Sequence, residues 1–228
     1  MKAPRRDDRA PPLRLLIREG LIIATRFYRV FGKLGERGPS DGPPLMVVPG
    51  FLAGDHTTLG LQRALGNAGY RVIGWGLGFN RGAQADTLER MIAEIERFGC
   101  GAKVTLVGWS LGGIYAREVA KVRPDLIAKV VTLGSPFSGD LRANHAWRLY
   151  QLIARHSVHD PPLKVDVRSK PPVPTLAIWS RSDGVVAPAS ARGGPDERDE
   201  ALELDCSHMG FGVSRRAYPK IVAAIRRF

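Results

Sequence analysis

Six short, mostly apolar runs alternate with segments of helical spacing, and this alternation determines the fold class that we expect. Such runs suit strands that are buried on both faces of a parallel sheet, which needs crossover helices on each side. The sequence therefore predicts a three-layer α/β fold with a mostly parallel sheet of about six strands. The expected strands are Leu45–Val48, Tyr70–Ile73, Val104–Val107, Val130–Leu133, Thr175–Trp179 and Ala201–Leu204.

Helical spacing fills most of the intervals between these runs, at Leu59–Ala68, Gln84–Phe98, Leu111–Val122 and, after the last run, Ser214–Arg227. Residues 136–173 break the rhythm, because they separate two expected strands by a long, Pro-bracketed interval with one short helical face. Loops after parallel strands gather at the edge where ligands bind, so this insertion is expected to be a lid or cap. We expect residues 45–228 to form one domain that carries it.

Residues 1–44 precede that domain and are expected to form a basic amphipathic helix, over residues 13–31, and a loop. One face of this helix is apolar, whereas Arg14, Arg18 and Arg29 share another. Packing of the apolar face against the domain is the interpretation we favour. The alternative is that the helix lies on a bilayer surface.

The formal net charge of +12 is concentrated at the two ends of the chain. Residues 1–37 carry ten basic and four acidic residues, and residues 212–228 carry five basic residues and no acid. A charge confined to the termini does not form a stripe for nucleic acid, so no nucleic-acid partner is expected. Peripheral contact with an anionic membrane through the basic termini is the alternative to a plain solvated surface.

The location that the sequence favours is the cytoplasm. No uninterrupted apolar segment approaches the ~20 residues that a membrane-spanning helix needs, and no clean apolar stretch follows the charged N-terminus as in a signal peptide. The two cysteines, Cys100 and Cys206, cannot build a disulfide framework. Attachment to the membrane periphery through the basic ends remains the alternative.

The segment Val104–Gly113 reads VTLVGWSLGG and places the pattern G-x-S-x-G where an apolar strand ends and a helix begins. In this setting the serine occupies a sharp turn that exposes its hydroxyl. Gly108 and Gly112 leave room around the turn, and Gly113 lets the helix pack closely. We therefore predict that Ser110 is a nucleophile. The alternative is a glycine-rich turn with an idle serine.

A serine nucleophile needs a base within hydrogen-bond reach, and the base needs an orienting acid. Asp183 follows the fifth expected strand and His208 follows the sixth, so both emerge at the same edge of the sheet as Ser110. The chain order Ser, Asp, His is the order that this strand–turn–helix motif requires. These three residues are the predicted catalytic triad.

Other histidines and acids fit these roles less well. The histidines between residues 145 and 159 lie in the expected lid, and His56 precedes the serine in the chain. Asp205 is too close to His208 in sequence to orient it easily.

The oxyanion that forms during acyl transfer needs two backbone N–H donors. One is expected from Leu111, the residue after the nucleophile. The other is expected from Phe51, in the loop Pro49–Gly54 after the first strand. The alternative for this loop is a plain turn that ends a strand.

An apolar rim at this edge would suit an acyl chain. The alternative is that several of the candidate residues pack in the core instead. The candidates are Leu52, Phe79, Trp109, Phe137 and Met209. No metal is expected, because His, Asp and Glu do not cluster at ligand spacing. No cofactor is expected either, since the glycines after the second strand lack the dinucleotide pattern.

Five segments together resemble the α/β-hydrolase superfamily, most closely its small bacterial lipase- and esterase-like members. They read Gly-Trp-Ser-Leu-Gly-Gly, Val-Pro-Gly-Phe, Ser-Arg-Ser-Asp-Gly-Val-Val, Ser-His-Met-Gly and Thr-Leu-Gly-Ser-Pro-Phe. The resemblance covers about residues 45–213. It implies the α/β-hydrolase fold, Ser110, Asp183 and His208 as the triad, and Phe51 and Leu111 as oxyanion donors. Family members often carry two further leading strands, so a trimmed sheet is expected here.

The activity that these residues predict is hydrolysis of carboxylic esters, as in an esterase or lipase, through an acyl-serine intermediate. The expected partner is therefore a small-molecule acyl ester. An acyltransferase or thioesterase with the same triad is one alternative. A non-catalytic protein that uses a hydrolase scaffold to bind a membrane surface or another ligand is the other.

Overall fold

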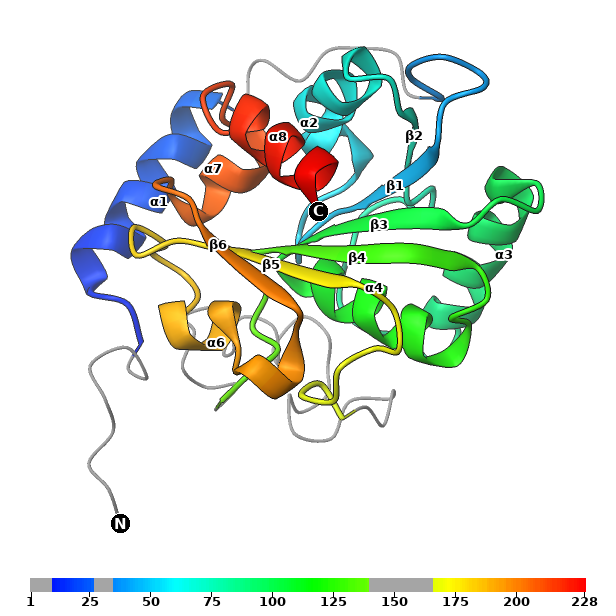
Figure 1. The fold of residues 1–228 in the computed structure, drawn as a ribbon. Coiled ribbons are helices and arrows are strands. Elements are labelled where there is room, and N and C mark those ends of the chain that lie inside the picture. Colours follow the sequence, from blue (N-terminus) through cyan, green and yellow to red (C-terminus); the bar gives the residue numbers. More distant parts are fainter. Residues whose placement is uncertain (1–9, 27–34, 140–165) are drawn as a thin grey trace.

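The expected strands form a single sheet in which all neighbouring strands run parallel, in the order β2-β1-β3-β4-β5-β6. The computed structural model describes residues 10–26, 35–139 and 166–228, and Figure 1 shows the sheet between two layers of helices. The fold class is the predicted one, with a sheet that is parallel throughout. The strands are β1 (Pro44–Val48), β2 (Arg71–Gly74), β3 (Val104–Trp109), β4 (Ile127–Leu133), β5 (Thr175–Trp179) and β6 (Glu200–Glu203).

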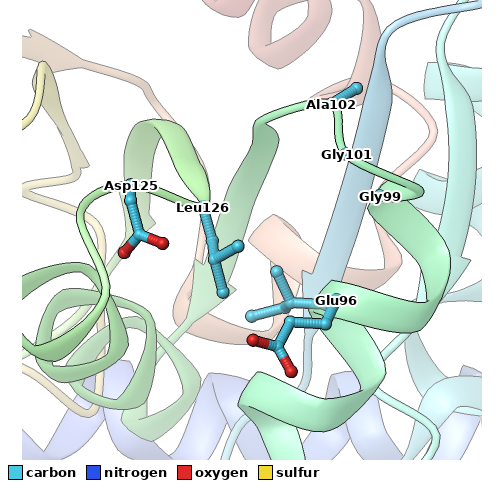
Figure 2. Close-up of a pocket in the computed structure, with 7 residues that line it drawn as sticks. Glu96, Gly99, Gly101, Ala102, Asp125 and Leu126 are labelled. Atoms are coloured by element: carbon cyan, nitrogen blue, oxygen red, sulfur yellow. The ribbon is translucent and has the colours of Figure 1, made fainter.

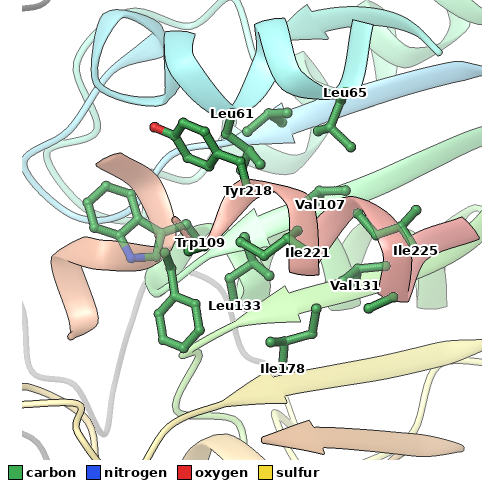
Figure 3. Packing of buried hydrophobic residues seen from close by; sticks show 14 of the residues in the cluster. Leu61, Leu65, Val107, Trp109, Val131, Leu133, Ile178, Tyr218, Ile221 and Ile225 are labelled. Atoms are coloured by element: carbon green, nitrogen blue, oxygen red, sulfur yellow. The ribbon is translucent and has the colours of Figure 1, made fainter. Parts of the chain in front are cut away.

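Helices cover both faces of the sheet, and each face has its own apolar core. One core lies under α2 (Asp55–Asn67) and α8 (Tyr218–Arg227), and the other lies under α3 (Thr87–Gly99) and α4 (Leu111–Val122). Figure 3 shows the first, in which Ile221 and Ile225 of α8 face the strand residues Val107 and Val131. Neighbouring strand residues serve opposite cores, since Leu106 belongs to the second and Val107 to the first. Two short helices, α6 (Pro188–Arg192) and the 3₁₀ helix η3 (Pro195–Glu197), connect β5 to β6.

The final helix, expected over Ser214–Arg227, begins later, at Tyr218 of α8, and a separate short helix, α7 (His208–Val213), precedes it. Ser207 begins α7, since its hydroxyl accepts a hydrogen bond from the Gly210 N–H at 3.1 Å. Ser214 is extended and ends α7. Pro219 then lies in the first turn of α8, where a missing N–H costs nothing.

The N-terminal helix α1 (Leu13–Arg26) packs against α7 (Figure 1). Residues 27–31 of the expected helix lie outside the described part of the chain, as do residues 140–165 of the expected lid. No helix among the described residues is long and apolar enough to cross a membrane.

Truncation of a core side chain tests this architecture. Leu106→Ala removes a fully buried side chain from β3, and we expect it to lower the free energy of unfolding by about 2–5 kcal/mol in urea denaturation. Val122→Ala is the matched control, because Val122 is 59% exposed, and it should change that free energy by less than about 0.5 kcal/mol. Equal losses in the two variants would contradict the assigned core.

Candidate active site

Ser110 lies on a strained turn between β3 and α4. Its backbone has φ 54° and ψ −121°, a conformation that residues with a side chain rarely adopt. The turn is held from both sides, because the Ser110 N–H donates to the Leu133 carbonyl at 2.9 Å and the Ser110 carbonyl accepts from the Gly113 N–H at 3.0 Å. Whereas Trp109 before it is buried, Ser110 is partly exposed. The turn therefore presents the serine at the carboxyl edge of the sheet.

The backbone of the loop after β1 lies close to this turn, and this explains one glycine in each segment. A Cβ atom at Gly112 would collide with the carbonyl groups of Val48 and Pro49, at the end of β1. A Cβ atom at Gly50 would lie 3.1 Å from the Ser110 Cβ atom. The loop after β1 therefore lies directly against the serine.

Asp183 and His208 form a buried, hydrogen-bonded pair. The His208 Nδ1 atom lies 2.7 Å from the Asp183 Oδ2 atom, and the two residues are 4% and 1% exposed. The other carboxylate oxygen of Asp183 accepts hydrogen bonds from the N–H groups of Val185 and Val186, each at 2.8 Å. The carboxylate is therefore fixed on both sides, and its bond to Nδ1 leaves Nε2 as the other ring nitrogen of His208.

The charge around His208 favours its protonated form. Burial alone would lower its pKa, but the carboxylates of Asp183 and Glu19 more than offset burial and raise the pKa above its usual value. A histidine in this environment is suited to accept a proton and to hold it as an imidazolium.

Trp109 connects the histidine loop to the serine turn. Its indole N–H donates to the His208 carbonyl at 3.1 Å, and the centroids of the two rings are 5.9 Å apart. The structure thus gathers the loops of Ser110, Asp183 and His208 at one edge of the sheet. Asp205 instead points to the surface, where its carboxylate accepts from the Ser182 hydroxyl at 2.9 Å.

Asn80, which sequence reasoning did not single out, fixes the loop that was predicted to hold the oxyanion. It is 1% exposed, and its side-chain amide donates to the Pro49 carbonyl at 3.0 Å. Its backbone N–H donates to the Ala53 carbonyl and its carbonyl accepts from the Leu52 N–H, both at 2.8 Å. Leu52 itself has φ 57°. The Asn-Arg-Gly sequence at residues 80–82 is typical of a turn, but it does not indicate that Asn80 binds the loop after β1.

The two predicted oxyanion donors come from the residue after the serine and from the loop that lies against the serine. Phe51 is partly buried in the loop that Asn80 fixes. Leu111 is the first residue of α4, so its N–H has no carbonyl partner within the helix.

Glu19 is a second residue that sequence reasoning missed. It lies in the middle of α1, yet it is only 3% exposed, and its carboxylate accepts hydrogen bonds from the His208 N–H at 2.6 Å and the Met209 N–H at 3.0 Å. The available signal was its position as the single acid of α1, three and four residues after Leu16 and Leu15.

The candidates for an apolar rim are placed unequally. Phe79 is 54% exposed, and Leu52 and Met209 are partly buried, whereas Trp109 is buried against the histidine loop. Phe137 was expected on the rim and lies in the core instead. It is fully buried, it packs with Ile114 and Ala177, and the guanidinium of Arg117 covers its ring at 4.2 Å.

The hollow in Figure 2 lies at the opposite edge of the sheet. Its lining comes from the end of α3 and from residues just before β3 and β4, including Glu96, Ala102, Asp125 and Leu126. It is therefore separate from the site at Ser110. Within the described ranges, no group of three or more His, Cys, Asp and Glu side chains could hold a metal ion.

The pKa of His208 tests the electrostatics of the pair. Asp183→Asn removes the main negative charge that stabilises the imidazolium, so NMR titration should give a lower His208 pKa than in the wild type, whose value should exceed about 6.5. Asp205→Asn removes a nearby exposed charge and should leave the pKa close to the wild-type value. A His208 pKa unaffected by Asp183→Asn would contradict the pairing.

Comparison with known proteins agrees with the observed fold. A family model described as alpha/beta hydrolase fold matches residues 43–161, just over half of the chain. The biotin biosynthesis bifunctional protein BioHC of Teredinibacter turnerae is 37% identical over 60 residues, a match that covers 26% of this chain and only 10% of that protein.

Solved structures share the fold at low sequence identity. One of the metagenome-derived lipolytic enzymes LipS and LipT superposes with a TM-score of 0.63 at 16% identity, over 85% of this chain and 97% of that one. The thioesterase domain from the curacin biosynthetic pathway gives a TM-score of 0.59 at 14% identity, over 85% and 94% of the two chains.

Proposed function

Because the chain belongs to the α/β-hydrolase fold family, we propose that it hydrolyses carboxylic esters through an acyl-serine formed on Ser110. The observation that carries this proposal is the buried Asp183–His208 pair, joined at 2.7 Å on loops that meet the strained turn of Ser110. Nucleophilic acyl transfer requires a serine hydroxyl within reach of an oriented imidazole, and these loops bring the two residues to the same edge of the sheet.

In the first half of the reaction, Nε2 of His208 takes the proton of the Ser110 hydroxyl as Oγ attacks the acyl carbon. The carbonyl π electrons move to oxygen and give a tetrahedral oxyanion. When the carbonyl re-forms, the bond to the alcohol oxygen breaks, and the imidazolium returns its proton to that oxygen. In the second half, His208 takes a proton from water as the water oxygen attacks the acyl-serine carbon and gives a second oxyanion. When that carbonyl re-forms, the bond to Oγ breaks, the imidazolium returns its proton to Oγ, and the acid leaves.

Asp183 supports both halves by holding the Nδ1–H tautomer and stabilising the imidazolium. The bonds from Val185 and Val186 keep its carboxylate aimed at His208 throughout the cycle. The N–H groups of Phe51 and Leu111 would stabilise the oxyanion, and Asn80 keeps the Phe51 loop in place beside Ser110.

The Ser110 hydroxyl provides the direct test. Purified wild type and Ser110→Ala are compared on p-nitrophenyl esters from acetyl to palmitoyl, and the variant should lose about 1,000-fold or more in kcat/KM, because it lacks the attacking oxygen. Ser169→Ala, which removes an exposed hydroxyl, should retain wild-type rates. Equal hydrolysis by wild type and Ser110→Ala would contradict the proposal.

The same acyl-serine would serve a thioesterase or an acyltransferase, which differ in the leaving group or the acceptor. Thioesters of matched chain length and an added alcohol acceptor extend the assay to these cases. Preferential cleavage of the thioester, or ester product in place of free acid, would reassign the reaction while leaving Ser110 as the nucleophile.

A further inference from the structure

The carboxylate of Glu19 joins three backbone N–H groups from two distant loops. Besides the bonds from His208 and Met209, its Oε1 atom accepts from the Gly184 N–H at 3.1 Å. Gly184 directly follows Asp183, and the other two donors include His208 itself. One side chain of α1 therefore binds both the loop of the acid and the loop of the base.

The burial of Glu19 is built into the fold. A buried carboxylate is costly unless hydrogen bonds replace its hydration, and three N–H donors do so here. The approach of α1 also requires a residue without a side chain, because a Cβ atom at Gly184 would collide with the Leu15 carbonyl. Two features far apart in sequence, a buried acid in α1 and a glycine after Asp183, thus serve one contact.

We propose that Glu19 is a positioning residue of the Asp183–His208 pair, a role that rests on the function proposed above. By holding the N–H groups of Gly184 and His208 on one oxygen, it sets the separation between the two loops and therefore the geometry of the Nδ1 bond. Small errors in such geometry are costly in acyl transfer, since the base must reach Oγ in line with its proton.

The negative charge of Glu19 also favours the protonated form of His208. Together with Asp183 it raises the pKa of His208. The thiol of Cys206, two residues before the histidine, stays protonated, since burial and the carboxylates of Asp183, Glu19 and Asp205 raise its pKa against the opposing charge of Arg18. Removing the Glu19 charge should therefore lower the pKa of His208.

Glu19→Gln tests this role. The amide keeps the size of the side chain but loses the charge. It also has only one accepting oxygen, because an NH₂ donor replaces the other carboxylate oxygen. We expect kcat to fall about tenfold or more. The apparent pKa of the acid limb in the kcat/KM–pH profile should fall by about one pH unit. The matched control is Asp205→Asn, which removes an exposed acid of the His208 loop. It should change neither kcat nor the acid limb of the pH profile.

A readout without turnover separates this proposal from the proposed function. The His208 pKa, measured by NMR in the Ser110→Ala background, should fall when Glu19→Gln is added, whatever the substrate is. If Glu19→Gln fails to fold, Glu19→Asp, which keeps the charge but withdraws it by one methylene, should lower kcat with a smaller shift of the acid limb. Wild-type kcat and His208 pKa in the substituted protein would overturn the positioning role.

The opposite face of α1 carries a second inference from a different observation. Leu13, Ile17 and Leu21 are 67%, 67% and 63% exposed, and their spacing of four residues aligns them in one row. Helical geometry places this row opposite Glu19, at roughly 100° per residue. Arg14 and Arg18 are also exposed and border the row.

We infer that this face contacts an anionic lipid surface. An exposed apolar row bordered by cations suits the boundary between lipid headgroups and acyl chains, and residues 1–37 as a whole carry a net +6. Because the inner face of α1 binds the Asp183 and His208 loops, such contact would bring the proposed site close to the lipid surface.

Vesicle flotation tests the contact. Wild type should float with vesicles containing about 30% phosphatidylglycerol, and Leu13→Ser/Ile17→Ser should lose most of that binding. The control Val122→Ser removes an apolar side chain that is 59% exposed on α4, and it should float like the wild type. Binding that the double variant retains would overturn the inference, as would a concentration-dependent dimer that only the double variant loses, because a second copy would then occupy the face.

Discussion

Parallel pairing of β1 with β3, of β3 with β4, of β4 with β5 and of β5 with β6 is the constraint on which the site depends. The ladder brings all the carboxyl ends to one edge. It therefore brings the loops of Ser110, Asp183 and His208, which are separated by up to 98 positions in the chain, to the same edge of the sheet. The two apolar cores hold the ladder from both sides, so the loops project from a rigid base.

The loops themselves are fixed by buried polar groups. Asn80 forms a hydrogen bond to the loop after β1, and Trp109 forms one between the serine turn and the histidine loop. Glu19 accepts hydrogen bonds from both the loop after β5 and the loop after β6. The strained Ser110 backbone is itself held by its hydrogen bonds with Leu133 and Gly113. Buried hydrogen-bonding side chains such as Asn80 and Glu19 thus lie where geometry matters most for the proposed acyl transfer.

Local signals in the sequence were enough to predict the strands, the start of α4 at Leu111 and the sheet edge at which the loops of Ser110, Asp183 and His208 lie. Period and composition determine each of these over a few residues. Glu19 and Asn80 were missed because their partners lie far along the chain, at Gly184 and Pro49, and no local pattern encodes such pairing. Phe137 was misplaced for a related reason, since the Arg117 guanidinium that covers it belongs to another element.

Covalent labelling tests whether Ser110 is a nucleophile activated by His208, without knowledge of the natural substrate. Wild type is treated with a fluorophosphonate and the modified peptide is identified by mass spectrometry. We expect one adduct, on Ser110, and a much slower reaction in His208→Ala. No adduct on Ser110, or labelling that proceeds equally fast without His208, would contradict this assignment.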